Sequence, residues 1–138
     1  MSKLSKDRPL EILNASAGSG KTYHLVRQYI QLLIADDVSH SNFKHLLAMT
    51  FTNKAALEMK ERIVQALNGI STRDISYETL KDALSLDLNA EAEKVISRCQ
   101  KVLETILHQY EDFHVMTIDK FNLRLIKSFS RDLDLPGE

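Results

Sequence analysis

The sequence of 138 residues has one cysteine and almost no net charge. A single thiol, Cys99, excludes an internal disulfide and fits a reducing compartment. The formal charge of −1 argues against a basic coat over the whole surface, but it allows local basic patches. The longest apolar stretch, YIQLLIA, is too short to span a membrane, and the start, MSKLSKDR, lacks the apolar segment of a secretory signal. These absences favour a cytoplasmic protein with no membrane association.

The histidines and the cysteine show no pattern that indicates a metal site. Cys99 lies on an apolar helical stripe, so we expect it in the core. The five histidines lack the spacing of metal ligands, and no structural metal is expected. These histidines are His24, His40, His45, His108 and His114.

Short apolar runs followed by helical periodicity predict three strand-to-helix units. Because strands alternate with helices, we expect a parallel sheet with helices on its faces. Ligands of such sheets bind beyond the carboxyl ends of the strands. The predicted strands are 10–13, 45–50 and 113–118, and the helices that follow them are 21–34, 55–67 and 120–132.

The segment between the second and third units, residues 68–112, is expected to be helical. A short helix is predicted around 77–84, and a long amphipathic helix from about residue 90 carries the apolar stripe that contains Cys99. With 43% hydrophobic residues, the chain can bury one domain-sized core.

Residues 14–22 read NASAGSGKT and form a candidate phosphate-binding loop. Such a loop directs successive backbone N–H groups at phosphate oxygens where a helix starts, and glycines give the backbone that freedom. Lys21 would reach the outer phosphates, and the hydroxyl of Thr22 would bind Mg²⁺. Alanine at the leading position is compatible with a negative φ. The loop residues are Ala15, Ser16, Ala17, Gly18, Ser19, Gly20, Lys21 and Thr22.

Each predicted strand-to-helix junction places a lysine near the first turn of its helix: Lys21, Lys54 and Lys120. A cation there costs a few tenths of a kcal/mol, because a helix N-terminus already carries about half a positive charge. A bound anion removes that cost. The nucleotide accounts for Lys21, and a second, extended anion would account for the other two.

The second junction reads TFTNKAA over residues 50–56. Thr50, Thr52 and Asn53 offer short polar groups for sugar-phosphate contacts, and Phe51 offers a flat surface for an unstacked base. The alternative is that Thr52 or Asn53 only caps the helix while Phe51 lies in the core.

The third helix carries four basic residues at spacings of four, three and four, which puts them on one narrow stripe. The stripe either follows phosphates or is an ordinary solvated face. Asp119 is placed to cap this helix, with Ile118 and Leu123 at the positions of a hydrophobic staple. The basic residues are Lys120, Arg124, Lys127 and Arg131.

Three segments together resemble the UvrD/Rep-like branch of superfamily 1 helicases, and within it the RecB/AddA type. ASAGSGKT is similar to motif I of that branch, LLAMTFTNKAALEMKERI to motif Ia, and VMTIDKFNLRLIKSF to motif Ib. In the RecB/AddA type a helical insertion separates motifs Ia and Ib, as 68–112 would here. The resemblance implies a RecA-like phosphate-loop NTPase sheet with flanking helices, here truncated.

The resemblance implies an ATP-driven motor on single-stranded DNA, and its possible partner is a second helicase-nuclease subunit. Lys21 and Thr22 would bind phosphate and Mg²⁺. No glutamine-containing adenine motif precedes the loop, so Tyr23 or His24 is the candidate for base contact. Asp119 stands where many members have histidine, which favours its capping role. The residues expected to hold DNA are Thr50, Phe51, Thr52, Asn53, Lys54, Thr117, Lys120 and Arg124.

The sequence ends before an Asp-Glu pair that would activate water and before the arginines of a second motor domain. We therefore expect a fragment of a longer protein that binds nucleotide weakly and hydrolyses essentially none by itself. The alternative is a complete small phosphate-loop kinase in which Asp119 holds Mg²⁺. That alternative leaves TFTNKAALEMKERI unexplained.

Overall fold

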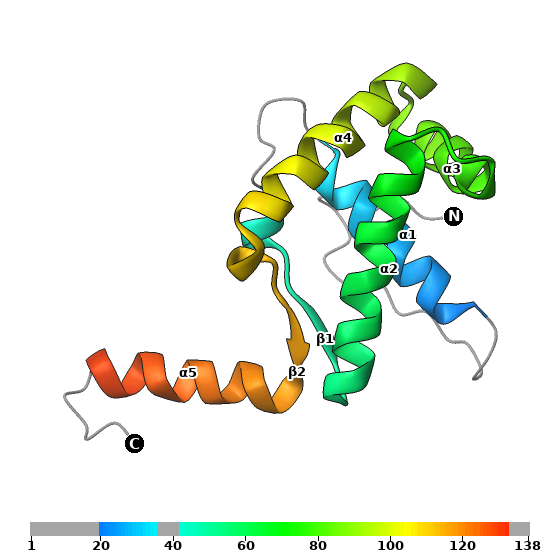
Figure 1. The fold of residues 1–138 in the computed structure, drawn as a ribbon. Coiled ribbons are helices and arrows are strands. Elements are labelled where there is room, and N and C mark those ends of the chain that lie inside the picture. The colour runs from blue at the N-terminus through cyan, green and yellow to red at the C-terminus, as the bar shows by residue number, and fades with distance from the viewer. Residues whose placement is uncertain (1–19, 36–41, 133–138) are drawn as a thin grey trace.

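A computed structural model describes residues 20–35 and 42–132 of the chain (Figure 1). The predicted strand 10–13 and residues 14–19 of the loop lie outside this part. In chain order the elements are α1 (Lys21–Leu33), the 3₁₀ helix η1 (Asn42–His45), β1 (Ala48–Thr50), α2 (Asn53–Ser71), η2 (Ile75–Tyr77), α3 (Glu78–Leu88), α4 (Ala92–His108), η3 (Tyr110–Asp112), β2 (Val115–Thr117) and α5 (Ile118–Asp132).

Strands β1 and β2 form a parallel pair in which Ala48 lies opposite Val115 and Thr50 lies opposite Thr117. Each strand is three residues long, so both are shorter than predicted. Helix α2 follows β1, and α5 follows β2 directly. The described residues are mostly helical, and the parallel pair is the part of the expected α/β sheet that they contain. Both carboxyl strand ends lie at the same edge of the sheet (Figure 1).

The hydrophobic core lies where α1, α2 and α4 pack together (Figure 1). Apolar residues three or four positions apart face inward from each helix, including Ile30, Ile63 and Ile106, and all three are completely buried. The predicted core position of Cys99 is confirmed, because its side chain is fully buried. Burial raises the pKa of the Cys99 thiol to about 12, so the thiol stays protonated.

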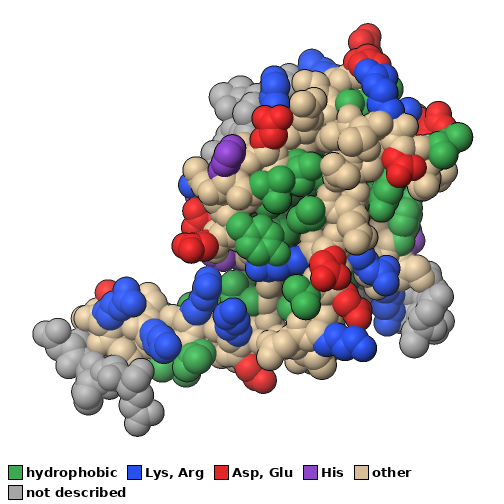
Figure 2. Space-filling view, in the orientation of Figure 1, with side chains coloured by type: hydrophobic (Ala, Val, Ile, Leu, Met, Phe, Trp, Pro, Cys, Tyr) green, Lys and Arg blue, Asp and Glu red, His purple; other side chains and the backbone are tan. Residues whose placement is uncertain are grey.

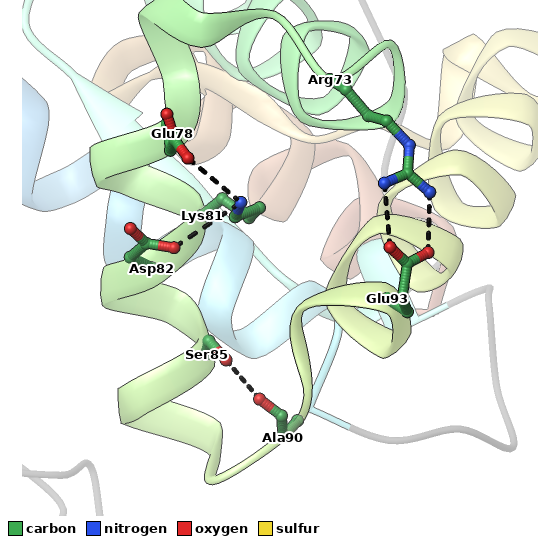
Figure 3. Close-up of polar contacts among 7 residues, drawn as sticks. All are labelled: Arg73, Glu78, Lys81, Asp82, Ser85, Ala90 and Glu93. Carbon is green, nitrogen blue, oxygen red and sulfur yellow. Dashed lines mark hydrogen bonds and ion pairs between the residues drawn. The ribbon is translucent and has the colours of Figure 1, made fainter.

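The helices between the two strands share this core. Helix α2 runs four residues beyond the predicted end at residue 67, while α3 and α4 correspond to the two predicted helices. An exposed ion pair joins Arg73, just after α2, to Glu93 in the first turn of α4 (Figure 3). The Ser85 hydroxyl donates to the Ala90 carbonyl and closes the turn between α3 and α4. Residues 68–112 are therefore helical, as predicted.

Helix α5 extends away from the rest of the molecule (Figure 1), and none of its residues is buried. The Thr117 hydroxyl accepts a hydrogen bond from the backbone N–H of Lys120 at 3.2 Å. Thr117 therefore caps α5 from the end of β2, and Asp119 lies inside the first turn. The predicted cap at Asp119 is wrong by two residues. The staple prediction fails with it, since Ile118 and Leu123 no longer flank the cap at the required positions.

Candidate nucleotide and nucleic-acid binding edge

Helix α1 begins directly after Gly20, whose φ of 85° lies in the left-handed region. A residue with a Cβ is strained in this conformation, so a glycine is needed to bring the chain into the helix at this angle. The first residues of α1, Lys21, Thr22 and Tyr23, are exposed. A lysine and a hydroxyl therefore stand at the positive end of a helix dipole, where an anion is stabilised. The loop residues Ala15, Ser16, Ala17, Gly18 and Ser19 lie outside the described residues.

The junction between β1 and α2 presents an aromatic ring to solvent. The Thr52 hydroxyl accepts from the N–H of Ala55 at 3.0 Å and caps α2, while the Thr50 hydroxyl donates to the Thr52 carbonyl at 3.0 Å. Phe51 lies between these two threonines, and 88% of its surface is exposed. The alternative interpretation is thus right about the cap at Thr52 and wrong about Phe51 in the core.

The register of the sheet brings the second and third junctions together. Thr50 and Thr117 are opposite each other, so the residues that follow them start from neighbouring points. Lys54 is the second residue of α2, Lys120 is the third residue of α5, and both are exposed. The residues that share this edge are Thr50, Phe51, Thr52, Asn53, Lys54, Thr117 and Lys120.

Arg124 lies one turn further along α5 than Lys120. Its Nη1 is 3.4 Å from Nδ1 of His114, the residue just before β2. Partial burial lowers the pKa of His114, and the charges of Arg124 and Lys60 lower it further, while Asp112 opposes them. The imidazole therefore favours its neutral form next to the Arg124 guanidinium.

Lys60 of α2 belongs to the same surroundings, although nothing in the sequence distinguishes it. Its Nζ lies 4.9 Å from the ring centroid of Tyr110 and 5.6 Å from that of Phe113, which are cation–π distances. Burial lowers the pKa of Lys60, and the charges of Lys120 and Arg124 lower it further. In the chain Lys60 is flanked by charges of both signs and looks like part of a solvated helix face.

Two junctions of the predicted basic edge are thus adjacent in space. The strand that precedes α1 lies outside the described residues, so the position of Lys21 along the same edge stays a prediction. Within 20–35 and 42–132, no group of three or more His, Cys, Asp or Glu side chains is arranged to hold a metal ion. None of the helices in those ranges has the length and apolar character needed to cross a membrane.

Parallel strands that each lead into a helix, together with a glycine-initiated helix that starts Lys-Thr, define an α/β protein of the phosphate-binding kind. A comparison with family models identifies it further. The chain belongs to the UvrD/REP helicase N-terminal domain family, whose model matches residues 5–137. This confirms the resemblance seen in the motifs, and such a domain fits a phosphate-loop NTPase fold. The small-kinase alternative is left without support.

The chain is similar to curated proteins named as AddA-type subunits of an ATP-dependent helicase/nuclease. It is 34% identical over 126 residues to that of Moorella thermoacetica, which covers 89% of this chain and 9% of the relative. It is 38% identical over 108 residues to that of Clostridium novyi, covering 78% of this chain and 8% of the relative. The chain thus spans less than a tenth of the length of these relatives. No solved structure matches the chain.

Proposed function

We propose that the chain is the N-terminal, ATP-binding part of a motor domain in a helicase-nuclease subunit that moves along single-stranded DNA. The domain would be RecA-like, and residues 68–112 would be a helical insertion between the two DNA-binding junctions. The family and the names of the relatives support this proposal.

The nucleotide would bind at the start of α1. Residues 15–20 would wrap the phosphates with backbone N–H groups, Lys21 would neutralise the outer phosphates, and the Thr22 hydroxyl would be a ligand of Mg²⁺. The positive φ of Gly20 and the exposure of Lys21 and Thr22 fit these roles. Tyr23, which is 43% exposed one residue later, would contact the base. Bound ATP with Mg²⁺ would supply the free energy of the motor through phosphoryl transfer to water.

The DNA strand would lie across the edge formed by the two strand ends. Thr50, Thr52 and Thr117 would position the backbone, while Asn53, Lys54, Lys120 and Arg124 would contact phosphates. The observation that carries this proposal is Phe51, an 88% exposed aromatic ring between a strand end and a helix N-terminus. Leaving such a ring in water is unfavourable, and an unstacked base would cover it.

The test is single-stranded DNA binding by the full-length protein with Phe51→Ala, measured as fluorescence anisotropy of a labelled oligonucleotide. Loss of one stacked base is expected to weaken binding on the order of tenfold. Leu86→Ala is the matched control, because Leu86 is 81% exposed on α3 and far along the chain from both junctions. The proposal for this edge fails if Phe51→Ala binds as tightly as the Leu86 variant.

The biological setting follows from the relatives in the same way. They are named as one subunit of a helicase/nuclease, which supports a second helicase-nuclease subunit in the role of partner. Work on DNA ends in recombination and repair, in the cytoplasm, would suit an ATP-dependent helicase/nuclease. A pull-down of the full-length protein from its own cells, followed by mass spectrometry of stoichiometric partners, tests the partner.

A further inference from the structure

Three basic side chains from two elements face one another beside the DNA edge. Lys60 comes from α2, and Lys120 and Arg124 come from α5. The charges of both α5 residues act on Lys60. Figure 2 shows basic side chains along α5 and a further one above that helix, beneath a group of hydrophobic side chains. We call these three residues the Lys60 cluster.

The Lys60 cluster differs from the other basic residues in how its charge is compensated. In the described part of the chain no carboxylate lies within ion-pair distance of Lys60, Lys120 or Arg124. Lys60 instead rests against the faces of Tyr110 and Phe113. Other basic residues are paired: Arg27 with Asp87, Lys44 with Asp112, Arg73 with Glu93, and Lys81 with Glu78 and Asp82.

Like charges that converge without a carboxylate repel one another, and the aromatic faces offset only part of that cost. Partial burial makes the cost larger at Lys60, because its ammonium group loses water. An anion that contacts the three side chains together would remove the repulsion. The cluster is thus built to receive negative charge.

The cluster continues the DNA edge away from Phe51. The backbone N–H of Lys120 is fixed by the hydroxyl of Thr117, and Thr117 lies opposite Thr50 in the sheet. Arg124 is one turn further from the strand ends, and Lys60 reaches toward η3 at Tyr110. A polyanion that crosses the strand ends thus meets the cluster next.

We propose that Lys60, Lys120 and Arg124 together bind a phosphodiester of the single-stranded DNA, a short distance along the strand from the nucleotide on Phe51. Tyr110, 43% exposed beside Lys60, lies within reach of the same nucleotide. The inference rests on the proposed DNA-binding function and adds Lys60 and the end of the segment 68–112 to the contact surface. The helical segment thus takes part in holding DNA.

The test compares Lys60→Gln with Arg62→Gln in the full-length protein. Each variant removes one positive charge from α2, and the two positions face different directions because successive helical residues are rotated by about 100°. Single-stranded DNA affinity is measured by anisotropy over a series of NaCl concentrations. Loss of one phosphate contact is expected to reduce the slope of log K against log salt by about 0.7 for Lys60→Gln, with several-fold weaker binding. Arg62→Gln is expected to keep the wild-type slope.

The outcomes separate this inference from the proposed function. If Lys60→Gln keeps the slope of Arg62→Gln while Phe51→Ala weakens binding, the cluster is not a DNA contact and the DNA edge stands. If neither Lys60→Gln nor Phe51→Ala weakens binding, both ideas fail. A free anion is the other source of phosphate: titration with inorganic phosphate by calorimetry, with an effect of Lys60→Gln there and none on DNA, also overturns the inference.

Discussion

Arg27 on α1 and Asp87 on α3 form an ion pair with two hydrogen bonds, from Nε to Oδ2 at 2.9 Å and from Nη2 to Oδ1 at 2.8 Å. Their side chains are only 15% and 14% exposed, and the hydrogen bond to Asp87 raises the pKa of Arg27. The pair connects the helix that starts at Lys21 to the helical segment between the two strands. It thereby fixes the candidate nucleotide helix to the body of the molecule.

Replacing Asp87 with alanine is expected to destabilise the fold, because it leaves a mostly buried guanidinium without its partner. A hydrogen bond to a charged group contributes about 1.5 to 3 kcal/mol, so we expect a loss of about 2 kcal/mol in the free energy of unfolding. Urea denaturation followed by circular dichroism measures this loss. Arg27→Ala combined with Asp87→Ala should cost less than the sum of the single changes.

The matched control is Glu93→Ala, which breaks the Arg73–Glu93 pair with the same two-point geometry (Figure 3). That pair is exposed at both ends, so water replaces the lost partner and the urea midpoint should hardly move. Equal shifts for Asp87→Ala and Glu93→Ala would show that burial does not give the first pair its strength.

Gly69 is the position in α2 where a side chain is least tolerated. A Cβ added there would lie 2.7 Å from Cγ of Tyr77 and closer still to Cδ2 and Cε2. Alanine ordinarily favours a helix over glycine by about 1 kcal/mol, but overpacking costs about 1 to 3 kcal/mol. Gly69→Ala should therefore lower the thermal midpoint, measured by calorimetry.

Tyr77→Ala provides the control for Gly69→Ala, since it removes the ring that the new Cβ would meet. In the Tyr77→Ala background the same glycine change should be neutral or stabilising, because only the gain in helix propensity remains. A constant cost of Gly69→Ala in both backgrounds would assign that cost to something other than the ring.

The order of strands and helices was predictable because it follows from local periodicity. The stripe through Cys99 predicted α4, and the apolar runs predicted β1 and β2, since each pattern involves neighbours along the chain. The loop at 14–19 and its preceding strand remain predictions. The cap of α5 was misplaced because Thr117 and Asp119 both have cap-forming side chains. The end of the strand at Thr117 decides between them, and strand ends are poorly defined by sequence.

The candidate site shows where local reasoning stops. Thr50 through Lys54 and Lys120 could be placed at strand ends from the sequence, and the parallel register brings them together. The exposure of Phe51 could not be predicted, because an aromatic residue after an apolar strand fits the core equally well. Lys60 was missed for a related reason: its neighbours Tyr110 and Arg124 are about 50 or more residues away in the chain.

His114 reports on the electrostatics of the Lys60 cluster through its pKa. Partial burial is the largest cause of its lowered pKa, Arg124 and Lys60 add to the effect, and Asp112 opposes it. A histidine with a lowered folded pKa binds fewer protons than in the unfolded chain. The stabilisation from neutral His114 is therefore complete above its ordinary pKa of about 6.5, and it is lost as pH falls through the folded value.

Two substitutions should move the pKa of His114 in opposite directions, measured by NMR titration of its ring. Arg124→Gln removes a facing positive charge and should raise the pKa toward its ordinary value, whereas Asp112→Asn removes the opposing negative charge and should lower it. Single-stranded DNA should raise the wild-type pKa, because a phosphate at the cluster favours the protonated ring. If DNA binds and the His114 pKa does not rise, the strand does not bring a phosphate to this place, whatever it does at Phe51.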